Sequence, residues 1–123
     1  MYTKRVLDIF KKPSNAGRII GADAVGEVGN VACGDIMKIY LKIEEDGMIK
    51  DAKFQTFGCA AAIASADTAC KLIKGRNINA SIKSTEVLND LGELPSQKVH
   101  CSVLAEQAFE AAKKDYAKKQ EKK

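Results

Sequence analysis

Hydrophobic and polar residues alternate most regularly between residues 37 and 44. The apolar residues fall at every second position, at Met37, Ile39, Leu41 and Ile43. A period of two is typical of a strand that buries one face. Asp46-Gly47 then suits a tight hairpin, and residues 52–56 alternate again as a returning strand. Glycine-interrupted residues 22–31 predict an irregular or edge strand with bulges. Together these segments predict a three-stranded antiparallel meander.

Helical periodicity appears on both sides of the predicted strands. Residues 3–12 place Val6, Leu7 and Phe10 on one helical face, and the pattern stops at Pro13. After Gly58, apolar residues recur at steps of four and three and predict a helix that ends near Gly75 and faces the sheet. Its stripe consists of Cys59, Ile63, Ala66, Cys70 and Ile73.

Further helices are predicted in the C-terminal third of the chain. Residues 79–83 and 85–91 indicate two short helices. A last helix begins near Ser102 and turns four residues inward: Leu104, Ala108, Ala111 and Ala112. Strands followed by helices indicate the α+β class, with helices covering one face of a small three-stranded antiparallel sheet.

Length and charge narrow the possible functions. A chain of 123 residues is expected to form one domain over residues 1–123. The net charge is +4, and Lys-rich residues 113–123 alone carry six Lys against two acids. The body is therefore neutral, which argues against nucleic-acid binding, and the tail is expected to be a solvated, fraying helix end.

Apolar stretches are too short for a membrane protein. The longest uninterrupted run has six residues, from Cys59 to Ala64, whereas a membrane-spanning helix needs roughly 20. Residues 1–8 lack the apolar region of a signal peptide. We therefore expect no membrane contact and a cytoplasmic location, where thiols stay reduced and disulfides are not expected.

Three of the four cysteines lie at predicted element junctions. Cys33 follows the first strand, Cys59 opens a helix, and Cys101 precedes the last helix. Helix N-termini favour the thiolate form that binds metals or accepts sulfur. With the neighbouring His100 and Asp35, these thiols make a mixed set of soft and hard ligands, which suits iron–sulfur chemistry and zinc equally well.

The cysteines and the histidine also allow roles outside such a site. Cys70 fits a small buried hydrophobe, because it lies about 16 Å along the helix from Cys59 and cannot share its metal. Cys101 with His100 could form a nucleophilic pair, but sequence neighbours rarely face each other and no oxyanion motif accompanies them. A purely structural zinc domain would lose stability without unfolding when the metal is removed.

Three strings of the sequence resemble the signature blocks of one known family. They are GEVGNVACGD (26–35), FQTFGCAAAIASAD (54–67) and LPSQKVHCSVLAEQA (94–108). In order, separation and flanking residues they are similar to the IscU/NifU-type iron–sulfur cluster assembly scaffold, in its stand-alone form. The resemblance implies a scaffold and carrier rather than an enzyme. Such a scaffold accepts sulfur from a cysteine desulfurase, binds iron, holds a labile 2Fe-2S cluster and passes it to recipient apo-proteins.

The resemblance also implies roles for particular residues. Cys33, Cys59 and Cys101 match the cluster cysteines, Asp35 and His100 match the non-thiol groups, and Lys98 matches a lysine beside the site. Family members without a cluster often hold zinc. We expect Cys101, on an exposed loop, to be the first persulfide acceptor. Asp35 is expected to keep the cluster labile by offering iron an exchangeable oxygen ligand.

Two departures from the family pattern bear on partners and on the alternative. The family often reads LPPVK where this chain reads LPSQK, so Ser96 and Gln97 put the partnership with a heat-shock-type chaperone in doubt. The proline usual in the first block is also absent. The alternative is a zinc-dependent sulfur acceptor of the SufU kind, which resembles a chain with an insertion between the second and third cysteines. Only 41 residues separate Cys59 from Cys101, which favours the scaffold.

Overall fold

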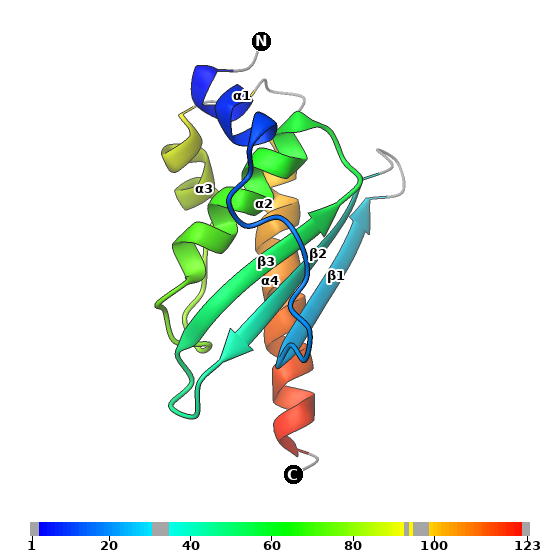
Figure 1. Ribbon diagram of the computed structural model, residues 1–123, viewed down its shortest axis with the longest axis vertical. Coiled ribbons are helices and arrows are strands. Elements are labelled where there is room, and N and C mark those ends of the chain that lie inside the picture. The colour runs from blue at the N-terminus through cyan, green and yellow to red at the C-terminus, as the bar shows by residue number, and fades with distance from the viewer. Residues whose placement is uncertain (1–2, 31–34, 93, 95–98, 122–123) are drawn as a thin grey trace.

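The computed structural model describes residues 3–30, 35–92, 94 and 99–121. Its three strands form one antiparallel sheet in the order β1-β2-β3, which confirms the predicted meander and the α+β class. The elements in chain order are α1 (Lys4–Lys11), β1 (Ala24–Asn30), β2 (Asp35–Ile43), β3 (Ile49–Thr56), α2 (Ala60–Ile73), α3 (Ser84–Leu91) and α4 (His100–Glu121). Figure 1 shows α4 crossing behind the sheet, with α2 beside it and α1 and α3 packed outside α2.

One face of the sheet packs against the helices and forms part of the hydrophobic core. The alternating residues Met37, Ile39 and Leu41 are fully buried, as their spacing predicts. Across the ladder, Ile39 pairs with Phe54 and Leu41 with Ala52, so the apolar rows of β2 and β3 coincide. Helices α2 and α4 contact these strands and cover this face.

The first strand is regular rather than bulged. Seven consecutive residues of β1 pair with β2 without interruption, and the irregularity of the sheet falls between Lys42 and Ile43 instead. Gly26 is explained by helix packing rather than by a bulge. A Cβ atom on Gly26 would lie 2.1 Å from the Ala108 carbonyl oxygen and 2.3 Å from the Ala112 nitrogen. Gly26 is therefore the point at which α4 packs directly on the strand backbone.

Helices α1 and α2 agree with their predicted ranges but differ in how much they bury. The α2 stripe is buried at Ala66, Cys70 and Ile73. On α1, by contrast, only Val6 is buried, while Leu7 and Phe10 are 39% and 44% exposed. The short helix packs on α2 but buries only one residue of its predicted apolar face. The prediction that Leu7 and Phe10 share a buried face with Val6 was therefore wrong.

The predicted helix over residues 79–83 is absent. The chain turns there because the Asn77 side-chain oxygen accepts a hydrogen bond from the Asn79 N–H at 2.9 Å, an interaction that competes with helix formation. The Arg76 guanidinium then donates to the Ser81 carbonyl at 3.1 Å. The next helix, α3, begins at Ser84, close to its predicted start.

The last helix begins two residues before Ser102 and runs through Glu121. Leu104, Ala108 and Ala112 are buried as expected, whereas Ala111 is only partly buried and the fully buried Phe109 was not predicted. Lys118 and Lys119 near its end are exposed. Within the described ranges, no helix combines the length and apolar character needed to span a membrane.

Candidate metal centre

Cys59 lies at the N-cap of α2 and has extended backbone angles, φ −77° and ψ −177°. Its thiol is partly exposed at the positive end of the helix dipole, an environment that favours an anionic sulfur ligand. The carbonyl of Cys59 accepts the first bond of the helix from the Ile63 N–H at 3.0 Å. The sequence prediction that Cys59 opens this helix is confirmed.

Hydrogen bonds tie the approach to Cys59 to the start of β2. The Thr56 hydroxyl donates to the Ile36 carbonyl at 2.6 Å and accepts from the Gly58 N–H at 3.2 Å. The Phe57 N–H donates to the same Ile36 carbonyl at 3.3 Å. Cys59 is therefore held near the strand end at which Asp35 begins β2.

Cys101 lies in the first turn of α4, next to His100. Its side chain is fully buried, so the expected exposed loop was wrong. The reason is the earlier start of the helix, since Ser102 is already bonded through its N–H to the Val99 carbonyl at 3.0 Å. The hydroxyl of Ser102 donates to the same carbonyl at 2.7 Å.

The Cys101 sulfur lies 3.7 Å from Nε2 of His100. Neighbouring helical positions are 100° apart, but an imidazole is long enough to reach back over the adjacent side chain. The expectation that these two residues would not face each other was therefore wrong. The pair brings one soft and one borderline metal ligand together.

The packing of α4 on β1 brings Cys101 to the same end of the molecule. The Asp115 carboxylate accepts the Val25 N–H at 2.9 Å, and Ala108 packs at Gly26, so the helix runs antiparallel to the strand. Five strand residues rise about 17 Å, the length of roughly 11 helical residues. The level of Asn30 is thus near Leu104, one turn from Cys101. Figure 1 shows the end of β1 and the starts of β2, α2 and α4 in the upper part of the view.

Cys33 and Lys98 lie outside the described residues, and for Asp35 only the backbone is described, paired with Asn30. Within the described ranges, no group of three or more His, Cys, Asp or Glu residues is close enough to hold a metal ion. The structure thus brings His100 and Cys101 into contact and places Cys59 at a helix start. The assignment of the complete ligand set stays a prediction.

Cys70 lies away from the helix starts that carry Cys59 and Cys101. It is fully buried in the last turn of α2, and burial, with a smaller contribution from the Asp67 carboxylate, raises the pKa of its thiol far above the ordinary value. A thiol that stays protonated is a poor metal ligand. The sequence-based interpretation of Cys70 as a core residue is confirmed.

Sequence reasoning missed an apolar border around this end of the molecule. Three large hydrophobic residues next to the candidate ligands are exposed: Ile36 (44%), Phe57 (86%) and Val103 (38%). Each follows or precedes a candidate ligand by one or two residues. The sequence contained one signal for Phe57. This aromatic residue directly follows the alternating residues of β3, so it lies beyond the end of the sheet.

The comparisons with known proteins agree with the fold. The chain belongs to the NifU-like N-terminal domain family, whose profile matches residues 1–123. The resemblance seen in the sequence is thereby confirmed.

Similar curated proteins carry the name iron–sulfur cluster assembly scaffold protein. IscU 1 of Archaeoglobus fulgidus is 50% identical over 121 residues, which cover 97% of this chain and 78% of that protein. IscU of Azotobacter vinelandii is 44% identical and covers 96% of this chain and 95% of its own length. IscU of Escherichia coli K12 is 42% identical, with coverage of 98% and 97%.

Solved structures share the architecture. A putative iron–sulfur cluster assembly scaffold protein for the SUF system, from Fervidobacterium islandicum AW-1, matches with a TM-score of 0.69 at 25% identity and covers 91% of this chain and 96% of that one. A NifU-like N-terminal protein from Brucella abortus matches with a TM-score of 0.67 at 20% identity, over 98% and 95% of the two chains. At 20% identity this second match bears on the fold alone.

Proposed function

We propose that this protein is a scaffold for iron–sulfur cluster assembly. It accepts sulfur from a cysteine desulfurase, combines it with iron, holds a labile 2Fe-2S cluster and delivers the cluster to apo-proteins. The observation that carries the proposal is the presentation of Cys59 and Cys101 at the starts of two helices at one end of the molecule. The relatives named as scaffolds, at 42–50% identity, support it.

The cluster is the cargo of this site, and the donor set fits it. Cys33, Cys59 and Cys101 would supply thiolates, the ligands that iron–sulfur clusters require. Asp35 and His100 are the candidates for the remaining position. The full burial of Cys101 would keep water from one side of the cluster, while the partly exposed Cys59 leaves the other side open for transfer.

Sulfur transfer is proposed to begin at Cys101. Its thiolate attacks the outer sulfur of the desulfurase persulfide, so a new S–S bond forms as the donor S–S bond breaks and the donor cysteine leaves as a thiolate. Reduction of the transferred sulfur to sulfide then needs two electrons from an external thiol or ferredoxin-type reductant. Because Cys101 is buried, this step also requires the first turn of α4 to open when the donor binds. Mass spectrometry of a trapped adduct tests it, and a persulfide found first on Cys59 would contradict it.

The apolar border formed by Ile36, Phe57 and Val103 supports docking of the desulfurase at this end. We expect Phe57→Ser to weaken co-purification with the enzyme, since an exposed aromatic side chain at an interface often contributes much of the binding energy. The matched control is Ile20→Ser, which removes an even more exposed hydrophobic side chain from a different loop. Equal losses in both variants would argue against this docking surface.

Anaerobic reconstitution with iron, cysteine and a desulfurase tests the proposed function. Cys33→Ser, Cys59→Ser and Cys101→Ser should each abolish the absorption and Mössbauer signature of the cluster, while Cys70→Ala should retain it. A Cys70→Ala variant as inactive as the others would contradict the three-cysteine assignment. Failure of the wild type to form a cluster, with tight zinc binding and rapid persulfide uptake, would favour the SufU-like sulfur acceptor instead.

A further inference from the structure

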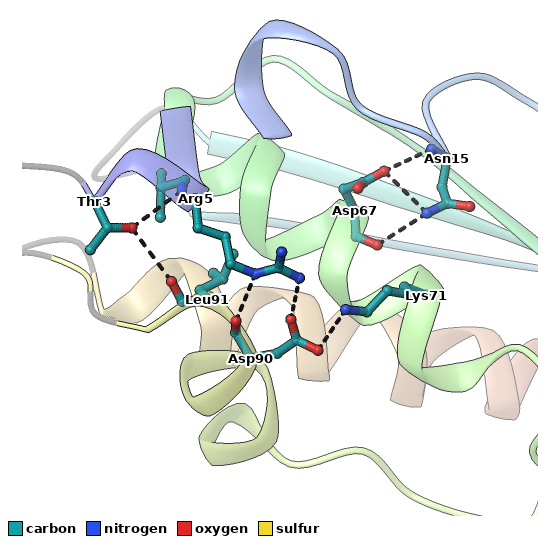
Figure 2. Close-up of polar contacts among 8 residues, drawn as sticks. Thr3, Arg5, Asn15, Asp67, Lys71, Asp90 and Leu91 are labelled. Atoms are coloured by element: carbon teal, nitrogen blue, oxygen red, sulfur yellow. Dashed lines mark hydrogen bonds and ion pairs between the residues drawn. The ribbon is translucent and has the colours of Figure 1, made fainter. Parts of the chain in front are cut away.

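The N-terminal segment of residues 3–17, here called the N-terminal arm, lies across α2 and reaches the outer edge of β3. One attachment is at the end of α3, as Figure 2 shows. The Arg5 guanidinium donates to the Asp90 carboxylate at 2.5 Å and to the Asp90 carbonyl at 2.8 Å. Lys71 of α2 pairs with the other Asp90 oxygen at 2.7 Å, so this carboxylate joins the arm to two helices.

A second attachment, also visible in Figure 2, is buried against α2. The Asp67 carboxylate accepts hydrogen bonds from the Asn15 N–H at 2.7 Å and from the Asn15 side-chain amide at 3.1 Å. The amide oxygen of Asn15 accepts from the Lys74 ammonium. Asn15 and Asp67 are only 4% and 6% exposed. Asn15 therefore bridges a buried carboxylate of α2 and the ammonium group of Lys74, at the C-cap of that helix.

The arm ends in an isolated parallel bridge to the sheet, in which Ala16 pairs with Phe54 of β3. The Phe54 N–H donates to the Asn15 carbonyl at 3.0 Å, and the Gly17 N–H donates to the Phe54 carbonyl at 2.8 Å. These bonds satisfy the open edge of β3 at Phe54. Gly17 has a φ of 132°, a conformation that L side chains rarely adopt, so the end of the arm requires a glycine.

The arm forms one wall of an apolar groove whose lining includes residues that flank Cys59 in the sequence. The groove has a volume of about 330 Å³. Pro13, Ala16 and Gly17 line it from the arm, and the opposite wall consists of residues 54–57 with Ile63. Residues 54–57 and Ile63 lie on the two sides of Cys59 in the sequence. Movement of the arm would therefore uncover the segments that hold this cysteine.

We propose that the N-terminal arm is a polar strap that opens as a unit and controls access to the first turn of α2. Within residues 3–17, only Val6 and Asn15 are buried, so little apolar surface holds the arm in place. Segments held mainly by polar contacts at the surface open at lower free energy than the core. Opening breaks the Asp67 and Asp90 attachments together and frees the edge of β3 at Phe54, in the segment that leads to Cys59. The inference concerns the chain without metal and does not depend on the proposed function.

Hydrogen exchange followed by NMR tests the strap in the metal-free chain. The reporter amides are Gly17 and Phe54, whose bonds join the arm to β3, and the reference amides are Ile39 and Leu41 in the central strand. Asp67→Ala should speed exchange at both reporters about tenfold or more and leave the reference amides unchanged. Equal acceleration at reporters and references would mean that the arm is an inseparable part of the global fold, and would overturn the proposal.

Two further variants keep the test decisive if Asp67→Ala folds poorly. Arg5→Gln changes a half-exposed residue at the other attachment, and opening as a unit requires it to speed exchange at Gly17 and Phe54 as well. The matched control is Asp51→Ala, since Asp51 lies 3.8 Å from the same Lys74 ammonium and should leave the reporters unchanged. Arg5→Gln without effect on the reporters, or Asp51→Ala with the full effect, would refute the strap.

A chemical measurement follows the consequence at Cys59. Alkylation by iodoacetamide, located by mass spectrometry, should be several-fold faster at Cys59 in Arg5→Gln than in the wild type. Labelling at the core residue Cys70 should not change. An unchanged rate at Cys59, in a variant whose reporter amides exchange faster, would overturn the claim that the arm controls this access.

Discussion

Substitution of Gly26 by alanine should displace α4 from the sheet. An added methyl group would lie 2.1 Å from the Ala108 carbonyl oxygen, 2.3 Å from the Ala112 nitrogen and 2.9 Å from the Ala112 Cα. All three are backbone atoms, so no side-chain rotation relieves the overlap. The helix has to retreat by about 1.3 Å to restore an ordinary 3.4 Å separation.

The expected loss of stability follows from two opposing effects. Overpacking of a tight contact costs about 1–3 kcal/mol, and this contact lies at the upper end because only backbone can move. Removal of a glycine from a strand returns about 0.5 kcal/mol. A net loss of about 2.5 kcal/mol should lower the urea midpoint of unfolding by about 1.5 M, measured by circular dichroism. Because α4 carries Cys101, alkylation of the Cys101 thiol should also be faster in Gly26→Ala than in the wild type.

A control separates this contact from a general effect of replacing glycine. An alanine methyl at Gly21 meets nothing within 4 Å, and only its φ of 74° opposes the change. Gly21→Ala should therefore cost about 1 kcal/mol, without faster labelling of Cys101. A Gly26→Ala variant with the wild-type urea midpoint would refute the inferred packing of α4 on β1. Equal losses of stability in both variants would show that Gly26 matters no more than any other glycine.

Further predictions concern individual groups and the metal. Cys70→Ala should cost about 1–2 kcal/mol in urea unfolding, through a small cavity, yet leave cluster reconstitution unchanged. Partial burial alone would raise the pKa of Asp90, but hydrogen bonds from Lys71 and Arg5 outweigh it and lower that pKa below its ordinary value. This stabilisation is present above about pH 4 and is lost at lower pH, so an acid titration of Asp90→Asn should show a shallower loss than wild type. Asp35→Ala should hold a cluster longer and transfer it more slowly to apo-ferredoxin; equal or faster transfer would return Asp35 to a turn-forming role. Metal removal by a chelator should lower the melting temperature without unfolding the chain.

Hydrophobic periodicity correctly predicted the helices and strands that bury a single row of apolar side chains. The strand around Ile39 and the helical stripe ending at Ile73 agree with their patterns, because a two-residue or 3.6-residue period fixes which side chains are buried. The conformation of residues 79–83 depends instead on a local hydrogen bond. The Asn77 side chain accepts the Asn79 N–H and forms a turn, which competes with helix formation. No period reveals such a contact.

Tertiary packing set the features that the sequence pattern described wrongly. Gly26 looked like a bulge because a glycine in a strand has several causes, and only the position of α4 distinguishes them. The burial of Cys101 likewise depends on where α4 begins, and helix starts are the least certain part of a prediction from sequence. The motif therefore identified the candidate ligands, while their exposure required the fold.

The two described cysteines of the candidate site are held by different parts of the fold. Cys59 is fixed locally, through the Thr56 hydroxyl that bridges the Ile36 carbonyl and the Gly58 N–H. Cys101 is fixed at long range, since its position depends on α4 lying against Gly26. A cluster under the proposed function needs both thiolates at once, so its assembly depends on the packing of the helix against the sheet. Gly26→Ala should therefore lose cluster assembly although residue 26 supplies no ligand, because the helix that carries Cys101 no longer fits against the strand.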